Sequence, residues 1–256
     1  MAPPHYYTSL GEFRDQFATG NPVLTYHKVG PRPRGARLKG LYLSPALFAR
    51  QLGELRAAGY RSGALEKTAG PREAGRMVLT FDDGFVNVLE HALAPLRETG
   101  FSAMQFLVAD LLGKTNEWEA AAGERTEPLM DVAQVREWLA AGHEIGSHTR
   151  THPFLTQVSR DAAREEISAS KKKLEDLFGR AIEHFCYPYG AWNPAVRDLV
   201  IEAGYRTACT TNNGVNTAAD SAFELKRITA RYRSRSLRNL VAWVRERLGR
   251  TSALGR

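Results

Sequence analysis

The sequence predicts an α/β fold, a parallel (β/α) barrel of about seven strands. Three observations lead to this prediction. Seven short apolar segments alternate with segments of helical spacing, capping and turn residues separate them, and no shift in composition divides the chain. Repeated alternation of strand and helix over 256 residues favours one parallel barrel, here one strand short of the usual eight.

The predicted strands are short apolar runs bounded by turn residues. They comprise residues 22–27, 77–81, 102–108, 143–147, 184–187, 205–210 and 225–230. In a barrel of this kind the chemistry is carried at the carboxyl ends of the strands. His27, the pair Asp82 and Asp83, and His148 each end or follow a predicted strand, and Arg227 lies within the last one. We therefore expect these side chains to meet at one end of the barrel.

The helices between the strands are predicted from capping residues and apolar spacing. Ser44 is expected to cap a helix that starts at Pro45 and ends before Gly59. Further helices are predicted over residues 86–98, 131–141, 161–178, 193–203 and 236–248, and three of them are expected to be capped by Asp131, Ser159 and Asn193. The helix over residues 161–178 is expected to expose a charged, solvated face made of Glu165, Glu166, Lys171, Lys172 and Lys173.

With 256 residues, 43% of them hydrophobic, the chain is long enough for one large domain or two small ones, and no shift in composition marks a second domain. We divide the chain into an N-terminal lead-in, residues 1–21, and a barrel domain, residues 22–256. The net charge of +7 comes without a nucleic-acid-binding motif, so no nucleic-acid partner is expected. No signal peptide or transmembrane stretch is recognisable, and two cysteines, Cys186 and Cys209, suit a reducing compartment. We therefore expect a cytoplasmic protein, unless a leader has been removed from the sequence.

Two adjacent carboxylates follow the second strand. Residues 77–79 are apolar, Asp82 and Asp83 come shortly after them, and Gly84 marks a sharp turn. Neighbouring carboxylates repel each other unless a positive charge holds them. A divalent cation would let one carboxylate bind the metal while the other stays free to move protons.

Two histidines four positions apart follow the fourth strand. His148 and His152 have a spacing that is common among metal ligands. Pro153 argues against a long helix here, so the pair is expected on a tight turn. Two histidines and one carboxylate leave coordination positions open for water and substrate, as a catalytic metal site requires.

A third motif is the turn after the fifth strand. Pro188 and Gly190 fix the turn, and its backbone N–H groups are able to point at a developing oxyanion. Together, Thr80-Phe-Asp-Asp-Gly84, the histidine pair, this Tyr-Pro-Tyr-Gly turn and Leu225-Lys-Arg227 resemble the motifs of the polysaccharide deacetylase family. This is the NodB-homology fold of carbohydrate esterase family 4. The likeness extends over residues 23–228 and includes the Tyr26-His27 pair of one branch of the family.

The resemblance implies a distorted barrel and a hydrolase that removes N-acetyl groups from an N-acetylated glycan or glycoconjugate. It also implies metal binding by Asp83, His148 and His152, with Zn²⁺ as the metal and Co²⁺, Ni²⁺ or Mn²⁺ as alternatives. The remaining matches give Asp82 as catalytic base, the Tyr189 backbone N–H as oxyanion donor, Leu225 as the wall of the acetyl pocket, and Tyr187 as a substrate contact.

Two positions depart from the family pattern. Many members carry an arginine where this chain has Cys186, and many carry a histidine that acts as general acid where this chain has Arg227. Arginine is a poor proton donor at neutral pH. We therefore predict that Arg227 pairs with Asp82, lowering its pKa and fixing its rotamer. The proton for the departing amine would then come from Asp82 or from His27.

Three other interpretations remain open from the residues. The chain is also compatible with hydrolysis of another non-peptide amide on the same fold, such as a formamide or a cyclic amide. The Cys186 and Arg227 departures suggest a degenerate glycan-binding module. Two histidines and one carboxylate also suit a non-haem Fe(II) oxygenase. That chemistry usually occupies an all-β jelly roll, however, and would not need Asp82.

Overall fold

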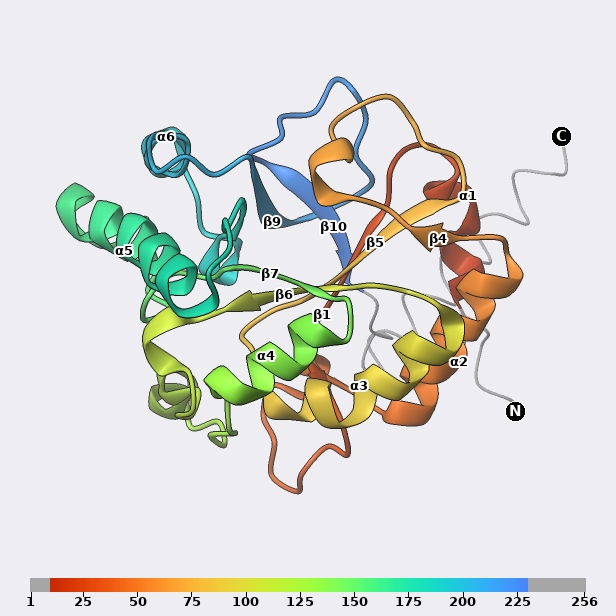
Figure 1. Cartoon of the computed structure of the whole chain (residues 1–256), viewed down its shortest axis with the longest axis horizontal. Helices are drawn as coiled ribbons and strands as arrows, with labels where there is room; N and C mark the ends of the chain where they lie inside the picture. Colours follow the sequence, from red (N-terminus) through yellow and green to blue (C-terminus); the bar gives the residue numbers. More distant parts are fainter. Residues whose placement is uncertain (1–9, 230–256) are drawn as a thin grey trace, which may run out of the picture.

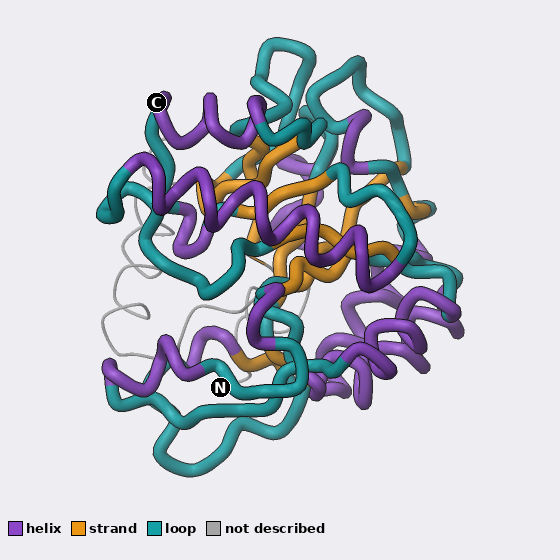
Figure 2. Tube along the Cα trace, turned by 60° about the vertical axis from the view of Figure 1, so that its left-hand side comes forward, coloured by secondary structure: helices purple, strands orange, loops and turns teal. Residues whose placement is uncertain are grey.

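The protein folds into a closed barrel of seven parallel strands. In the computed structural model, which describes residues 10–229, the strands are β1 (Val23–Tyr26), β5 (Arg76–Phe81), β6 (Met104–Leu107), β7 (Glu144–Ser147), β8 (His184–Cys186), β9 (Thr207–Asn213) and β10 (Leu225–Thr229). Neighbours pair in the order β1-β10-β9-β8-β7-β6-β5, and β5 pairs with β1 to close the ring. The predicted α/β barrel and all seven of its strands are confirmed. Figure 2 shows the strands gathered centrally with helices outside them.

Helices follow most of the strands and cover the barrel. They are α1 (Arg14–Phe17), α2 (Pro45–Ala57), α3 (Val86–Thr99), α4 (Val132–Ala140), α5 (Arg160–Phe178) and α6 (Pro194–Glu202). Figure 1 shows α2, α3 and α4 along one side of the barrel, with α5 and α6 together on another. Within residues 10–229, no helix combines the length and the apolar character needed to cross a membrane.

Capping residues start three of these helices as predicted. Asp131 forms a reciprocal capping box with Gln134 at α4, and the side chains of Ser159 and Asn193 accept backbone N–H bonds at α5 and α6. Ser44 is at the N-cap position of α2, but its side chain makes no capping hydrogen bond. The predicted helix over residues 236–248, and Ala230 at the end of the last predicted strand, lie outside the described residues.

Short elements add to the predicted ones. Strand β4 (Arg61–Ser62) pairs with the start of β5, and β2 (Lys28–Val29) pairs with β3 (Tyr42–Leu43) outside the barrel. The 3₁₀ turns are η2 (Leu10–Phe13), η3 (Lys39–Leu41), η4 (Leu65–Lys67), η5 (Ala109–Leu111), η6 (Glu117–Ala122) and η7 (Pro188–Gly190). Leu10 and Phe17, inside the segment predicted as a lead-in, pack into the main core. The division of the chain at residues 21 and 22 stays a prediction.

Strand alternation decides which side chains enter the barrel. In β5, Leu79 and Phe81 belong to the large hydrophobic cluster between strands and helices, whereas Val78 belongs to a second, smaller cluster. Successive strand residues point to opposite faces of a sheet. Thr80 and Asp82 therefore point inward with Val78, and Asp82 reaches the interior at the carboxyl end of the strand.

Candidate active site

The predicted catalytic residues meet at the carboxyl end of the barrel. Asp82 and Asp83 follow β5, His27 follows β1, and His148 follows β7. Arg227 reaches the same place from β10, where it is 2% exposed. The shared edge of a parallel barrel explains how residues up to 200 positions apart converge here.

Asp83, His148 and His152 form a compact group of possible metal ligands. Asp83 Oδ1 lies 3.4 Å from His148 Nε2 and 3.4 Å from His152 Nε2, and all three residues are at most 5% exposed. His148 Nδ1 is 2.7 Å from the Cys186 carbonyl oxygen, to which it donates a hydrogen bond when it carries the proton. That bond leaves Nε2 with its lone pair directed to the group. Two imidazoles and a carboxylate, with their ligand atoms within 4.8 Å of one another, therefore suit a divalent cation.

His152 is held by aromatic neighbours. Trp118 stacks on its ring with the centroids 4.4 Å apart and the planes 22° apart, and the Tyr189 ring meets it edge-on at 4.5 Å. The predicted site did not include Trp118, which η6 places over the histidine. These contacts fix the plane of the His152 imidazole and so the direction of its Nε2 atom.

The backbone of the site is conformationally costly. Within residues 10–229, four non-glycine residues have a positive φ: Asp83 (77°), Thr149 (68°), His152 (66°) and Tyr189 (58°). All four belong to this site. Such a conformation costs a non-glycine residue about 1–3 kcal/mol and persists where the surrounding structure imposes it. The backbone strain is therefore concentrated at the candidate metal ligands and in the turn after β8.

Glu166 of α5 clamps the turn between the two histidines. Its carboxylate accepts the backbone N–H of Arg150 at 2.8 Å, the N–H of Thr151 at 2.9 Å, and the Thr151 hydroxyl at 2.7 Å. Thr149 Oγ1 also accepts the N–H of His152 at 3.0 Å. The prediction that Glu166 belongs to a solvated face was therefore wrong. The side chain is half-buried and serves the turn that carries His148 and His152.

Asp82 has a different partner. Both its carboxylate oxygens accept bonds from the Arg227 guanidinium, at 2.7 and 2.8 Å, in a bidentate pair. The same arginine donates to Thr80 Oγ1 at 3.1 Å, to the Thr210 carbonyl at 2.9 Å and to Cys186 Sγ at 3.1 Å. The predicted pairing of Arg227 with Asp82 is present in the structure, and it orients one face of the carboxylate.

Charge and burial set the protonation of the two acids. Burial alone raises the pKa of Asp82, but the charge of the Arg227 guanidinium outweighs it and holds that pKa below its usual value. Burial is likewise outweighed at Asp83, where the adjacent His148 and His152 imidazoles keep the pKa well below the usual value. Both acids are therefore carboxylates at neutral pH.

His27 adjoins Asp82 rather than the histidine pair. Its Nε2 lies 3.7 Å from Asp82 Oδ2, and its side chain is 23% exposed. Burial lowers the pKa of His27, against the opposing effect of Asp82 and Asp83. The imidazole is therefore neutral at pH 7. The charge of the adjacent Asp82 carboxylate is balanced by Arg227 instead.

The other predicted residues surround this centre in different ways. Tyr189 belongs to the turn η7 and is 41% exposed, and partial burial raises its pKa to about 12. Tyr187 is fully buried, and its hydroxyl donates to the Phe223 carbonyl at 3.1 Å, which ties its side chain to the segment before β10. Leu225 is fully buried opposite Cys209. The substrate roles of Tyr187 and Leu225 stay predictions.

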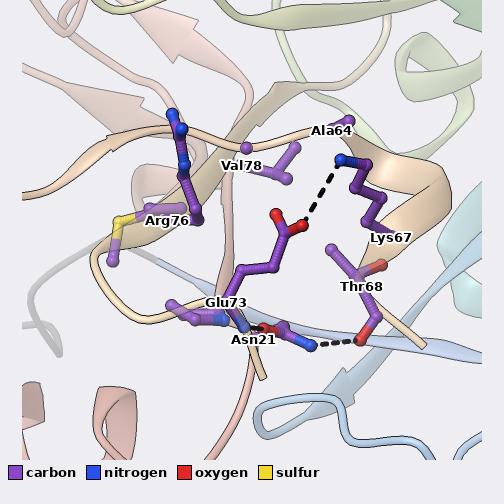
Figure 3. Close-up of a pocket in the computed structure, with 10 residues that line it drawn as sticks. Asn21, Ala64, Lys67, Thr68, Glu73, Arg76 and Val78 are labelled. Atoms are coloured by element: carbon purple, nitrogen blue, oxygen red, sulfur yellow. Dashed lines mark hydrogen bonds and ion pairs between the residues drawn. The ribbon is translucent and has the colours of Figure 1, made fainter. Parts of the chain in front are cut away.

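A separate polar hollow lies near the amino ends of β1 and β5. Figure 3 shows the Lys67–Glu73 ion pair, 3.4 Å between Nζ and Oε1, spanning it beside Asn21. Asn21 is 5% exposed and hydrogen-bonded to its neighbours at both ends of its amide. The polar groups of the Asn21 side chain are therefore partnered within the protein. None of the catalytic candidates lines the hollow. The chemistry therefore belongs to the carboxyl end.

Comparisons with known proteins agree with this fold and show the family of the chain. A family sequence model described as "Polysaccharide deacetylase" matches residues 69–208, more than half of the chain. YxkH of Bacillus subtilis (strain 168), whose name assigns it to the polysaccharide deacetylases, is 23% identical over 219 residues, 81% of this chain and 70% of the relative. The peptidoglycan-N-acetylglucosamine deacetylase of Bacillus cereus (strain ATCC 14579) is 30% identical over 123 residues, 48% of this chain but only 39% of the relative.

A solved structure supports the fold in the same way. The Streptococcus pyogenes deacetylase PplD, determined in complex with acetate, superposes with a TM-score of 0.72 at 24% identity. The match covers 87% of this chain and 97% of PplD. At this level of identity the match shows a shared fold.

Proposed function

The chain belongs to the polysaccharide deacetylase family, and we propose that it is a metal-dependent hydrolase that removes N-acetyl groups from an amino-sugar glycan or glycoconjugate. The predicted enzyme class, a polysaccharide deacetylase, follows from that membership. The observation that carries the finer proposal is the contrast between two adjacent acids. Asp83 faces two imidazoles, whereas Asp82 faces a guanidinium.

The metal would be held by Asp83, His148 and His152. Their donor set suits Zn²⁺, with Co²⁺, Ni²⁺ or Mn²⁺ as alternatives. A divalent cation in this place supplies a Lewis acid that polarises an amide carbonyl and makes water more acidic. The Cys186 carbonyl orients His148, Trp118 orients His152, and the protein so determines where the cation would sit.

Asp82 would take the proton of the attacking water. It is an ionised carboxylate within the barrel mouth, and Arg227 fixes its rotamer through two hydrogen bonds. General-base catalysis of this kind contributes about 10²–10⁴-fold in rate. A lowered pKa makes Asp82 a weak base, but it also makes the protonated acid a good donor in the following step. We therefore assign Arg227 as the residue that positions this base.

The reaction also requires stabilisation of the oxyanion and a proton for the departing amine. The backbone N–H of Tyr189, in a turn held by the Gly190 N–H bond to the Tyr187 carbonyl at 2.9 Å, would stabilise the oxyanion. The departing amine would receive its proton from Asp82. A neutral His27 is less suited to that donation, because its lowered pKa leaves no imidazolium at pH 7. His27 then borders Asp82 and the substrate.

The substrate class is supported by relatives and fold together. A relative of this chain is named for acting on N-acetylglucosamine in peptidoglycan, and others are named for chitooligosaccharides. The parallel α/β barrel argues against a non-haem Fe(II) oxygenase, which usually uses a jelly roll. Hydrolysis of a different non-peptide amide remains the alternative that the same residues would serve.

The proposal is tested by acetate release. The purified protein, loaded with Zn²⁺, is incubated with N-acetylglucosamine oligomers, and acetate is measured in parallel with Asp83→Ala and with protein stripped by a chelator. Acetate is expected from the loaded wild type and from neither control. A metal-loaded wild type that yields no acetate, while formamide or cyclic amide substrates are turned over, would replace the proposed reaction by the alternative one.

A further inference from the structure

Two exposed aromatic rings are stacked beside the candidate metal ligands. Phe154 and Tyr189 lie with their ring centroids 3.7 Å apart and their planes only 7° apart. Each residue is 41% exposed. Because each ring covers one face of the other, the exposed area of Phe154 has to lie on its outer face and its edge.

This pair differs from ordinary exposed hydrophobic residues. Large hydrophobic side chains that are exposed within residues 10–229 are Leu38, Phe154, Val158, Tyr189 and Ile201. Scattered single cases need no explanation, whereas grouped ones mark surfaces that bind something. Phe154 and Tyr189 touch each other, and Val158 follows Phe154 in the same loop.

The pair is continuous with the active site. The Tyr189 ring meets the edge of the His152 ring with the centroids 4.5 Å apart. Phe154 is two residues after His152 in the chain, and its ring centroid lies at most about 8 Å from that of His152. A group stacked on Phe154 would therefore lie close to the candidate metal ligands, on the side of His152 where Tyr189 lies.

The chain holds both rings in place. Pro153 precedes Phe154, the following residue Leu155 is 1% exposed, and the Gln157 N–H donates to the Phe154 carbonyl at 2.8 Å. Tyr189 lies in the turn that follows the buried Tyr187. Buried neighbours fix the backbone on both sides, so little additional ordering is needed when a ligand binds.

The chemistry of the surface favours a sugar. A phenyl ring has no hydrogen-bonding group, and its face carries partial negative charge. The C–H groups on one face of a pyranose carry partial positive charge and form a flat apolar patch of matching size. We infer that Phe154, supported by Tyr189, is a stacking subsite for a sugar ring next to the N-acetyl sugar that reacts. This inference rests on the proposed function, and it names an oligosaccharide or polysaccharide chain as the substrate in preference to a monosaccharide derivative or sugar nucleotide.

The subsite is tested by comparing chain lengths. Initial rates of acetate release are measured with N-acetylglucosamine and with its β-1,4-linked pentamer for wild type, Phe154→Ala, Phe154→Tyr and Ile201→Ala. Loss of the ring is expected to lower the pentamer-to-monomer ratio of kcat/KM about fivefold, mainly through KM for the pentamer. Phe154→Tyr keeps the ring and should keep the ratio. Ile201→Ala removes a similarly exposed side chain from α6 and should also keep it.

A binding measurement separates the two proposals. Pentamer binding is measured by calorimetry in an Asp82→Asn background, with and without Phe154→Ala. Weaker binding after Phe154→Ala supports the subsite even if the wild type releases no acetate, in which case only the proposed reaction fails. A pentamer-to-monomer ratio unchanged in Phe154→Ala, or pentamer binding that is absent or insensitive to that substitution, would overturn the subsite.

Discussion

Both ends of the barrel carry buried polar side chains, but they satisfy them in different ways. At the amino end, the Asn21 amide donates to the carbonyls of Thr68, Gly70 and Pro71, at 3.1–3.2 Å, and accepts the Glu73 N–H at 2.8 Å. Every polar atom of that side chain has a backbone partner. The amide thereby ties the loop before β5 to the chain entering β1.

At the carboxyl end, polar groups face other ionisable groups instead. Asp83 faces two imidazoles, and Asp82 faces Arg227. The positive-φ residues other than glycine that the structure describes are also confined to this end. A buried polar group whose hydrogen bonds are all made to the backbone stabilises the fold. A cluster of acids and imidazoles on strained backbone stabilises the fold poorly, so we attribute it to chemistry.

Removing the charge of Asp82 should give the largest effect. Asp82→Asn keeps the shape of the side chain but removes the proton acceptor, so kcat is expected to fall about 10³-fold. The matched change is Asp110→Asn, which alters a carboxylate that pairs with Arg150 and Lys173 at the surface. Acetate release measured at saturating Zn²⁺ compares the two. If Asp82→Asn retained wild-type kcat, Asp82 would not be the base.

Truncating Arg227 should come next, with an effect on both rate and pH dependence. Arg227→Ala is expected to lower kcat about 10²-fold, because Asp82 loses its orientation. The guanidinium lowers the pKa of Asp82, so its removal raises that pKa. Activity requires the carboxylate, and the acid limb of the kcat/KM profile should therefore move to higher pH.

The control for this variant is Arg206→Ala, which removes an arginine whose partner Glu183 is at the surface. Full kcat in Arg227→Ala, with an acid limb at the wild-type position, would leave Arg227 with no part in catalysis. A fall in stability alone would indicate an ordinary buried ion pair.

Removing the Asn21 amide sharpens the contrast between the two ends. Asn21→Ala leaves three carbonyls and one N–H at the amino end without their partner, and the free energy of unfolding should fall by about 2–3 kcal/mol. Thr19→Ala, which removes an exposed hydroxyl, should change it little. Urea unfolding measures the difference. The kcat of the folded Asn21→Ala protein should stay at the wild-type value. A large fall in that kcat would contradict the assignment of the amino end to stability and of the carboxyl end to catalysis.

The smallest of these effects is expected at the clamp below the histidine turn. Glu166→Ala releases the N–H groups of Arg150 and Thr151, and the affinity for Zn²⁺ is expected to fall about tenfold. The matched variant Glu165→Ala removes only an exposed ion pair with the Arg150 side chain and should bind Zn²⁺ normally. Competition with a chromophoric chelator measures both. Equal affinities would reduce Glu166 to a surface residue.

Most of the fold was predictable because its signals are local. The apolar runs before Asp82 and His148, and the caps Asp131, Ser159 and Asn193, locate strands and helices within one or two residues. The two-residue strands β2, β3 and β4 were missed, since so short a segment has no periodicity.

The site residues that belong to sequence motifs were predictable, whereas those that act from other segments were not. Asp82, Asp83, His148 and Arg227 follow from residue types at strand ends. Trp118 and Glu166 act across long separations in the chain, from a loop and from a helix face that looks solvated, so no spacing in the sequence marks them. Arg227 could be predicted as the partner of Asp82 only because this chain has Cys186 where many members of the family carry an arginine.

The central claim is that two adjacent carboxylates divide the work, Asp83 binding the metal and Asp82 moving the proton. The most direct measurement is the zinc content of purified protein after dialysis against a zinc buffer, for wild type, Asp82→Asn, Asp83→Asn and His152→Ala. We predict about one zinc per chain in wild type and Asp82→Asn, and almost none in the other two variants. Zinc retained by Asp83→Asn but lost from Asp82→Asn would contradict the account.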